Sequence, residues 1–153
     1  MDKKYSQIYR ENAKYVYNIA LGMLKNRDDA EDVTQNVFIK LFDSFGSFRK
    51  ESSIKTYLYR MTINRSIDLI RKNRTADKYL EKSPSESRGS SEHSFILWDL
   101  LGRLDLNHRT PLLLSEIGGF SYKEISVILS INTGTVKSRI NRAVNRLKKM
   151  VKE

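Results

Sequence analysis

Two stretches of this sequence hold the side chains best suited to chemistry, and in both the chemistry is recognition. Residues 28–43, DDAEDVTQNVFIKLFD, carry five acids against one lysine in a chain whose net charge is +10. Residues 133–153 carry a net charge of +6. Arginine, lysine and asparagine side chains can bind phosphates and base edges of DNA. The basic stretch therefore suits a nucleic acid, whereas an acidic surface suits a protein partner.

The groups from which catalytic and metal sites are usually built are missing. The chain has no cysteine, which excludes disulfides and thiolate metal sites. Its two histidines, His93 and His108, stand apart, and neither has a neighbouring pattern of metal ligands. No glycine-rich loop could cradle a phosphate. We therefore expect no enzymatic activity, no cofactor, no metal and no small-molecule substrate.

The distribution of charge indicates a polyanionic partner. The net charge is +4 over residues 1–27, −4 over 28–43, +6 over 44–74, −2 over 75–132 and +6 over 133–153. Two basic blocks on either side of an acidic region suggest polyanion binding at two places. Neither block has the apolar face of an interfacial helix, and no apolar run could span a membrane. A soluble, cytoplasmic protein without membrane insertion is expected.

The acidic stretch is predicted to be a helix with one buried face. Five of its residues are apolar and recur at helical spacing. They are Ala30, Val33, Val37, Phe38 and Leu41. Asp28 and Glu31 have the spacing of an N-cap and its N3 partner. Capping does not account for the polar row Asp32, Gln35 and Asn36, which is either a solvated face or a surface that binds a partner.

Two further helices are expected in the N-terminal half, over residues 8–24 and 54–74. Residues 44–53 should form a loop, because Gly46 and several serines interrupt the periodicity. The helix over 54–74 has apolar residues on two sides and six basic residues interleaved with Tyr57 and Tyr59. Basic side chains neutralise phosphate and aromatic rings stack on unpaired bases, although a core helix with exposed arginines would have a similar pattern.

Residues 83–94, SPSESRGSSEHS, have the composition of a flexible linker. The chain is thus predicted to be all-α, with two small helical domains joined by a flexible Ser-rich linker. In the second domain we expect helices over 95–104 and over 109–117, with Pro111 in the first turn of the latter. Gly118 and Gly119 should end that helix.

The last two predicted helices form a helix-turn-helix. Ser121 and Glu124 have the spacing of a capping box that opens a helix through Leu129, and Thr133 can cap the final helix. One side of the final helix is apolar. The opposite side carries Thr135, Ser138, Asn141, Arg142, Asn145 and Lys149. Arginine reads guanine and asparagine reads adenine in the major groove, so this helix is predicted to bind DNA.

Both halves resemble the extracytoplasmic-function (ECF) group of bacterial RNA polymerase sigma factors. In the N-terminal half the resemblance lies in DAEDVTQNVFIKLF (29–42) and SSIKTYLYRMTINRSIDLIRK (52–72). In the C-terminal half it lies in RTPLLLSEIGGFSYKEI (109–125) and GTVKSRINRAVNRLKK (134–149). The resemblance covers nearly the whole chain apart from the linker.

The resemblance implies a plan for the whole molecule. Residues 1–76 would be a region 2-like domain that binds core polymerase and recognises and melts the −10 element. Residues 77–94 would be the linker, and residues 95–153 a region 4-like helix-turn-helix domain that recognises the −35 element. The polar row Asp32, Gln35 and Asn36 would contact the clamp helices of the polymerase β′ subunit.

For −10 DNA the resemblance points to the loop over 44–53, which would capture an extruded base, and to the basic helix that follows. Tyr57 stands where primary sigma factors carry part of an aromatic pair that wedges the duplex open. The residues implied in −10 binding are Phe48, Arg49, Lys55, Tyr57, Arg60, Asn64 and Arg65.

For −35 DNA the resemblance points to the final helix. The residues implied are Thr135, Lys137, Ser138, Arg139, Asn141, Arg142 and Arg146. The preceding helices would hold the tip of the β flap, and Ser130 stands where the helix-turn-helix usually has glycine. The family also implies an anti-sigma factor as a partner. The alternative is a stand-alone helix-turn-helix regulator whose N-terminal bundle senses a signal or dimerises, but it leaves the acidic surface unexplained.

Overall fold

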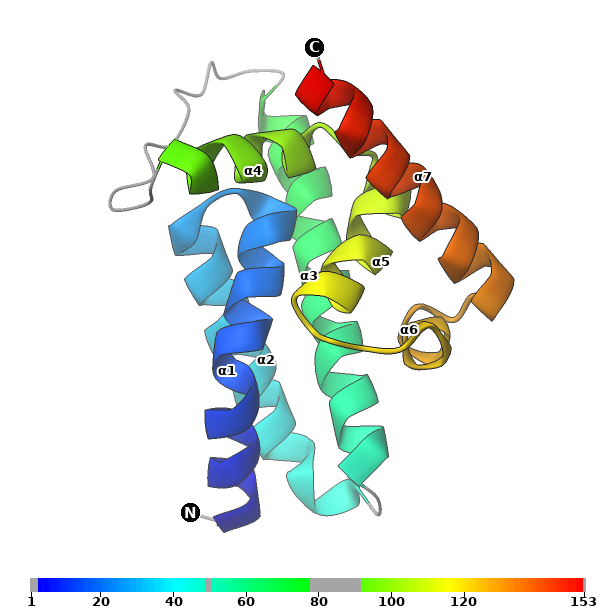
Figure 1. Ribbon diagram of the computed structural model, residues 1–153. Coiled ribbons are helices and arrows are strands. Elements are labelled where there is room, and N and C mark those ends of the chain that lie inside the picture. The colour runs from blue at the N-terminus through cyan, green and yellow to red at the C-terminus, as the bar shows by residue number, and fades with distance from the viewer. Residues whose placement is uncertain (1–2, 49–50, 78–91, 153) are drawn as a thin grey trace.

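The computed structural model describes residues 3–48, 51–77 and 92–152, and these are helical apart from short turns (Figure 1). The elements are α1 (Lys3–Leu24), α2 (Arg27–Ser44), the short 3₁₀ helix η1 (Phe45–Ser47), α3 (Glu51–Asp77), α4 (Glu92–Gly102), α5 (Leu106–Glu116), α6 (Tyr122–Leu129) and α7 (Thr133–Lys152). The all-α prediction is confirmed. Within these ranges no helix combines the length and apolar character needed to cross a membrane.

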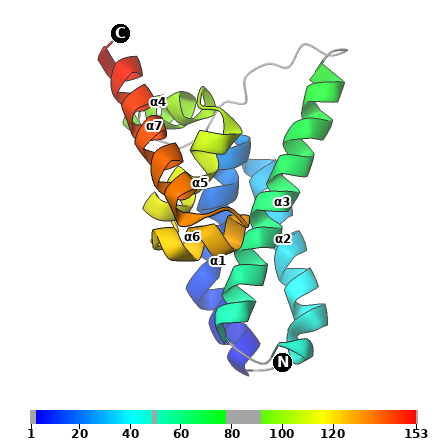
Figure 2. The same ribbon diagram turned by 90° about the vertical axis from the view of Figure 1, so that its right-hand side faces the viewer.

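α1, α2 and α3 pack side by side (Figures 1 and 2). α2 buries the five apolar residues that its sequence predicts. The predicted cap of α2 was wrong. The cap is Asn26, two residues before Asp28, and its side chain accepts a hydrogen bond from the Asp29 N–H at 3.0 Å. Asparagine and aspartate are equally good caps, so the apolar pattern could not distinguish them. Asp28 and Asp29 lie in the first turn, where acids suit the helix dipole.

α3 is buried on two sides, as its sequence predicts. Leu58 and Ile63 are both buried, and Ile63 lines a cavity shared with α5 and α6. Tyr59 is also buried, and its hydroxyl donates a hydrogen bond to Asn12 Oδ1 at 2.9 Å. Burial raises the pKa of Tyr59 well above its ordinary value, so this hydroxyl keeps its proton. α3 begins at Glu51 rather than at residue 54, so the predicted loop over 44–53 is shorter and includes η1.

α5 begins at Leu106, three residues before the predicted start at Arg109. Pro111 therefore lies in the second turn rather than the first, and the prediction of its place was wrong. A proline there cannot donate to the carbonyl four residues earlier, at Asn107. Asn107 is exposed, so water can satisfy that carbonyl.

The helix-turn-helix forms largely as predicted. Gly119 ends the preceding segment with a φ of +68°, and the capping box is present, with Ser121 Oγ 3.1 Å from the Glu124 N–H and Glu124 Oε1 2.9 Å from the Ser121 N–H. The predicted cap of α7 was wrong. Asn132, rather than Thr133, accepts the hydrogen bond from the Thr135 N–H, at 2.9 Å. Both residues can cap a helix, and asparagine does so better than threonine.

Ser130, in the turn of this motif, should be more stable as glycine. It follows α6 with φ of 56° and ψ of 44°, the left-handed region that disfavours residues with a Cβ. We expect Ser130→Gly to raise the free energy of unfolding by about 1 kcal/mol and the melting temperature by about 3 °C. The matched control is Ser126→Gly inside α6, which should lower both quantities. A thermal melt in which the two variants shift in the same direction would contradict this account of the turn.

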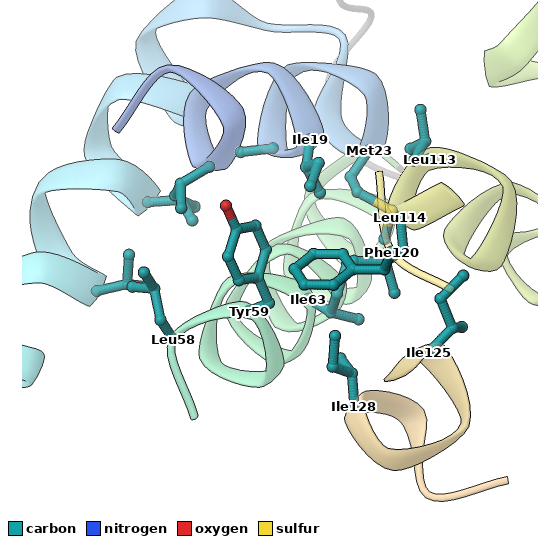
Figure 3. Packing of buried hydrophobic residues seen from close by; sticks show 14 of the residues in the cluster. Ile19, Met23, Leu58, Tyr59, Ile63, Leu113, Leu114, Phe120, Ile125 and Ile128 are labelled. Atoms are coloured by element: carbon teal, nitrogen blue, oxygen red, sulfur yellow. The ribbon is translucent and has the colours of Figure 1, made fainter. Parts of the chain in front are cut away.

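The two halves of the chain pack against each other. α4 and α5 lie against α1, and α6 lies against α3 (Figures 1 and 2). Buried residues of both halves form one continuous cluster, in which the rings of Tyr59 and Phe120 meet edge to face with centroids 4.7 Å apart (Figure 3). Most of the predicted linker, residues 77–94, lies outside the described residues. α4 already begins at Glu92, so the linker ends earlier than predicted.

Candidate protein-binding and DNA-binding surfaces

The polar row on α2 lies on its outward face. Asp32 and Gln35 are exposed and Asn36 is half-buried. Ile39 follows Asp32 by seven residues, two helical turns, and is therefore on the same face with 62% of its surface exposed. An exposed isoleucine beside a carboxylate and an amide contributes nothing to the core of this chain. The four residues together, named here the α2 face, are one exposed apolar side chain and three polar ones on the same side of the helix.

Sequence reasoning missed Ile39, and it also missed Phe42, whose surface is 52% exposed. The signal was present, because neither residue belongs to the apolar stripe that α2 buries. Apolar residues outside a helix's buried stripe are candidates for an interface. The ring of Phe42 packs edge to face on Tyr5 of α1, with centroids 5.0 Å apart, so α1 supports this end of α2.

Two of the predicted −10 residues lie together at the start of α3. The rings of Phe48 and Tyr57 are in tilted contact with centroids 5.0 Å apart, and both are half-buried. The hydroxyl of Tyr5 donates to the Phe38 carbonyl at 2.8 Å, and the Tyr5 ring packs on Phe45. The N-terminal turn of α1 thus helps to position the segment that leads to Phe48. Arg49 falls outside the described residues.

The basic −10 residues follow along α3 and differ in their contacts. Lys55 is exposed, with its ammonium 5.8 Å from the centroid of the Phe120 ring, and Asn64 is exposed. Arg60 is half-buried and donates to the carbonyls of Val127 and Ile128 in α6. Arg65 is half-buried, and its Nε has no hydrogen-bond partner within the described residues. Five of the six described residues of the predicted −10 set therefore lie on α3. One of the five, Arg60, is bound to the C-terminal half.

The predicted −35 residues lie on α7, and most of them face outward. Those that are exposed are Lys137, Ser138, Asn141, Arg142 and Arg146. Thr135 and Arg139 are half-buried. The Thr135 hydroxyl donates to Asn132 Oδ1 at 2.8 Å, so it helps to cap α7, and Arg139 lines a cavity of about 270 Å³ next to α3.

The inward side of α7 is buried as predicted at Val136, Ile140 and Ala143. Val151 was also predicted to belong to this stripe, but 70% of its surface is exposed. The stripe is therefore buried over the first half of α7 and reaches solvent at the end. Among the described residues no group of histidine, cysteine, aspartate and glutamate side chains could hold a metal ion.

Comparison with known proteins identifies the family of the chain. A family model described as Sigma-70 region 2 matches residues 8–76, and one described as Sigma-70, region 4 matches residues 94–147. The ECF RNA polymerase sigma factor SigW of Bacillus subtilis (strain 168) is 31% identical over an alignment that covers 95% of this chain and 86% of SigW. This chain belongs to the ECF RNA polymerase sigma factors. The ECF RNA polymerase sigma-E factor of Haemophilus influenzae is 33% identical over 77% of this chain and 72% of that protein.

The sigma factor shares its fold with solved structures. The sigma factor RpoE in complex with the anti-sigma factor NepR from Bartonella quintana superposes with a TM-score of 0.83 at 25% identity, covering 99% of this chain and 98% of RpoE. CnrH in complex with the cytosolic domain of CnrY superposes with a TM-score of 0.76 at 22% identity, covering 97% of this chain and 87% of that chain.

The function of the protein follows from its family. An ECF sigma factor directs transcription initiation by RNA polymerase and is not an enzyme, as its composition predicts. The alternative of a stand-alone regulator with a sensing or dimerising bundle is set aside, because the N-terminal bundle matches sigma-70 region 2.

Proposed function

We propose that this sigma factor binds core polymerase through the α2 face, with Asp32, Gln35 and Asn36 on the β′ clamp helices. The support is the exposed row of polar groups beside Ile39, in the one strongly acidic region of a basic chain. Phosphate repels such a surface, so DNA does not compete for it. The domain plan is a polymerase-binding and −10-binding unit that ends with α3 at Asp77, a linker over 78–91, and a −35-binding unit that begins with α4 at Glu92.

The start of α3 binds and helps to open the −10 element. Phe48 and Tyr57 offer two rings in contact, on which an unpaired base can stack. Lys55, Arg60, Asn64 and Arg65 follow along the same helix, with Arg49 preceding it, and their side chains suit the phosphates and edges of the melted strand. Flipping a base costs a few kcal/mol, and each stacked base returns about 1–3 kcal/mol.

α7 reads the −35 element in the major groove. The candidates for reading bases are Lys137, Ser138, Asn141 and Arg142. The candidates for binding the DNA phosphate backbone are Arg139 and Arg146, and Thr135 lies at the start of the helix. The amino end of a recognition helix is the part that enters the groove in helix-turn-helix proteins. The helices before α7 hold the tip of the β flap.

An anti-sigma factor is a proposed partner of this chain. Two solved structures of similar fold are complexes, one with the anti-sigma factor NepR and the other with the cytosolic domain of CnrY. The protein acts in the cytoplasm, where core polymerase and the chromosome are.

The observation that carries the proposal is the pair of surfaces on one small chain, an acidic and apolar face on α2 and a basic, amide-rich face on α7. Run-off transcription with added core polymerase tests it directly. We expect transcripts from a matched promoter and none from core polymerase alone. The absence of any promoter-specific transcript over a panel of candidate promoters would contradict the proposal.

Tyr57 tests the melting role separately. Replacing Tyr57 by alanine removes the ring that contacts Phe48 and on which a flipped base would stack. Transcription from a duplex promoter should therefore fall by roughly tenfold, the equivalent of one lost stacking contact. Tyr57→Phe keeps the ring and should retain most activity. On a template with a pre-melted bubble, the alanine variant should regain most of its transcription activity. Equal loss on duplex and bubble templates would mean that Tyr57 serves only to pack Phe48.

A further inference from the structure

The C-terminal half sits on the edge of α3 that the proposed function assigns to −10 DNA. Arg60 donates from Nε to the Ile128 carbonyl at 3.0 Å and from Nη2 to the Val127 carbonyl. Both carbonyls belong to the last turn of α6, where four carbonyls have no partner within the helix and the dipole favours a cation. The guanidinium of Arg60 therefore caps α6 from outside it.

A second arginine makes the reverse contact. Arg109 of α5 is only 7% exposed, and its Nη1 donates to the Met23 carbonyl at the end of α1, at 2.8 Å. Its Nη2 donates to the carbonyls of Leu104, at 2.9 Å, and Gly102, at 3.2 Å, in its own half. Each half of the chain thus supplies an arginine that caps a helix of the other half.

The two arginine contacts flank a close apolar contact. A Cβ placed on Gly22 of α1 would lie 2.7 Å from Leu113 Cδ2 and 3.0 Å from Trp98 Cζ3. The three nearest atoms that it would meet all belong to the C-terminal half. The absence of a side chain at position 22 lets α4 and α5 approach α1, and Phe120 packs on Tyr59 farther along (Figure 3).

The contact between the halves leaves open space around Arg60. An open groove of about 1000 Å³ lies beside Arg60, between α1, α3 and α6, and the 270 Å³ cavity lies on its other side. Contacts of this kind within a chain resemble transient interfaces, for which relative motion is the default.

This closed arrangement cannot reach both promoter elements. The −35 and −10 elements are about 25 base pairs apart, roughly 85 Å at about 3.4 Å per base pair. α3, the longest helix, has 27 residues and is therefore about 40 Å long. The fourteen residues between α3 and α4 could span at most about 50 Å when fully extended. Promoter binding at both elements requires the halves to part.

We propose that Arg60 and Arg109 form a reversible latch that holds the sigma factor closed, and that closure and −10 strand binding compete for Arg60. The inference rests on the proposed role of Arg60 in −10 binding. In the closed state the α2 face is free, because α2 packs mainly on α1, α3 and η1. Core polymerase can therefore bind before the latch opens, whereas single-stranded DNA must wait for it.

Interdomain energy transfer in the full-length chain tests the latch. The chain has no cysteine, so Lys14→Cys on α1 and Glu116→Cys on α5, both at exposed positions, give one dye on each half. Gly22→Leu inserts a side chain between the halves without changing a residue assigned to DNA or polymerase. Gly46→Leu is the matched control, since a Cβ there meets nothing within 4 Å.

We expect efficient energy transfer between the dyes in the labelled chain without further substitution and in its Gly46→Leu variant. Energy transfer should be weak in the Gly22→Leu and Arg60→Ala variants. The helical circular dichroism should be the same in all four proteins. A short mixed-sequence single-stranded oligonucleotide should bind Gly22→Leu about tenfold more tightly, because only the open fraction binds it. Adding Arg60→Ala to Gly22→Leu should remove most of that gain.

Two results would overturn the latch. One is unchanged transfer in both Gly22→Leu and Arg60→Ala. The other is an open Gly22→Leu variant that binds the oligonucleotide no more tightly than the unmodified protein. The proposed function is tested separately by run-off transcription, which does not depend on the dyes, so a failure of the latch leaves that result standing.

Discussion

Replacing Asp32 by lysine should lower the affinity of the sigma factor for core polymerase by roughly thirtyfold. Asp32 is exposed on the α2 face, two turns before Ile39, and has no hydrogen bond or ion pair within the described residues, so the loss should be confined to binding. Reversing a charge inside an interface removes a favourable pair and adds a repulsion, worth about 2 kcal/mol or more. The affinity can be measured by fluorescence anisotropy of the labelled sigma factor titrated with core polymerase.

Glu31→Lys is the matched control for this variant. Glu31 is also exposed and acidic but lies one residue away, about 100° around the helix, so it changes net charge equally without touching the α2 face. We expect Glu31→Lys to lose only a little affinity for core polymerase, and added salt should remove this difference. −35 DNA binding should be intact in Asp32→Lys. Equal weakening by the two variants would show that only the overall charge matters, and a selective loss of DNA binding would overturn the assignment.

Replacing Arg142 by alanine should weaken −35 recognition by about 1–3 kcal/mol, which is between roughly fivefold and 150-fold in affinity. Arg142 is exposed on the outward face of α7, two turns after Thr135. A guanidinium that forms two hydrogen bonds with guanine discriminates against the other bases. The loss should therefore be confined to one position of the element and should disappear when that base pair is already substituted.

Promoter variants with each −35 position substituted in turn, tested with the reconstituted holoenzyme, check this expectation. Lys149→Ala is the control, because Lys149 is an exposed basic residue on the same helix but lies far from the amino end of that helix. It should weaken binding slightly and uniformly and reduce the salt dependence. If Arg142→Ala also weakens binding equally on every sequence, Arg142 contacts phosphate and does not read a base.

Local structure was predictable where one signal dominated. The buried stripes of α2 and α7 and the capping box of Ser121 and Glu124 follow from periodicity and spacing alone. The errors lie where two neighbouring residues could play the same part. Asn26 and Asn132 are the caps in place of Asp28 and Thr133, because either member of each pair can accept the hydrogen bond.

Long-range packing was not predictable from local pattern. Nothing near Arg60 or Arg109 in the sequence indicates that their hydrogen bonds end on carbonyls 67 and 86 residues away, at Val127 and Met23. Pro111 was assigned to a first turn because proline is costly later in a helix, yet Asn107, whose carbonyl loses its donor, is exposed and can bind water instead. The resemblance to sigma factors identified candidate residues, but only the fold shows which of them the other half engages.

The packing around Gly22 also gives the molecule an optical reporter. Trp98 is the single tryptophan of the chain, and its ring lies against Gly22 at the junction of the halves. If the halves part, the indole moves from a half-buried site into water, and its emission should shift to longer wavelength and change in intensity. The opening rate of the free sigma factor is thus measurable by stopped-flow mixing with DNA, in protein that carries no label and no substitution.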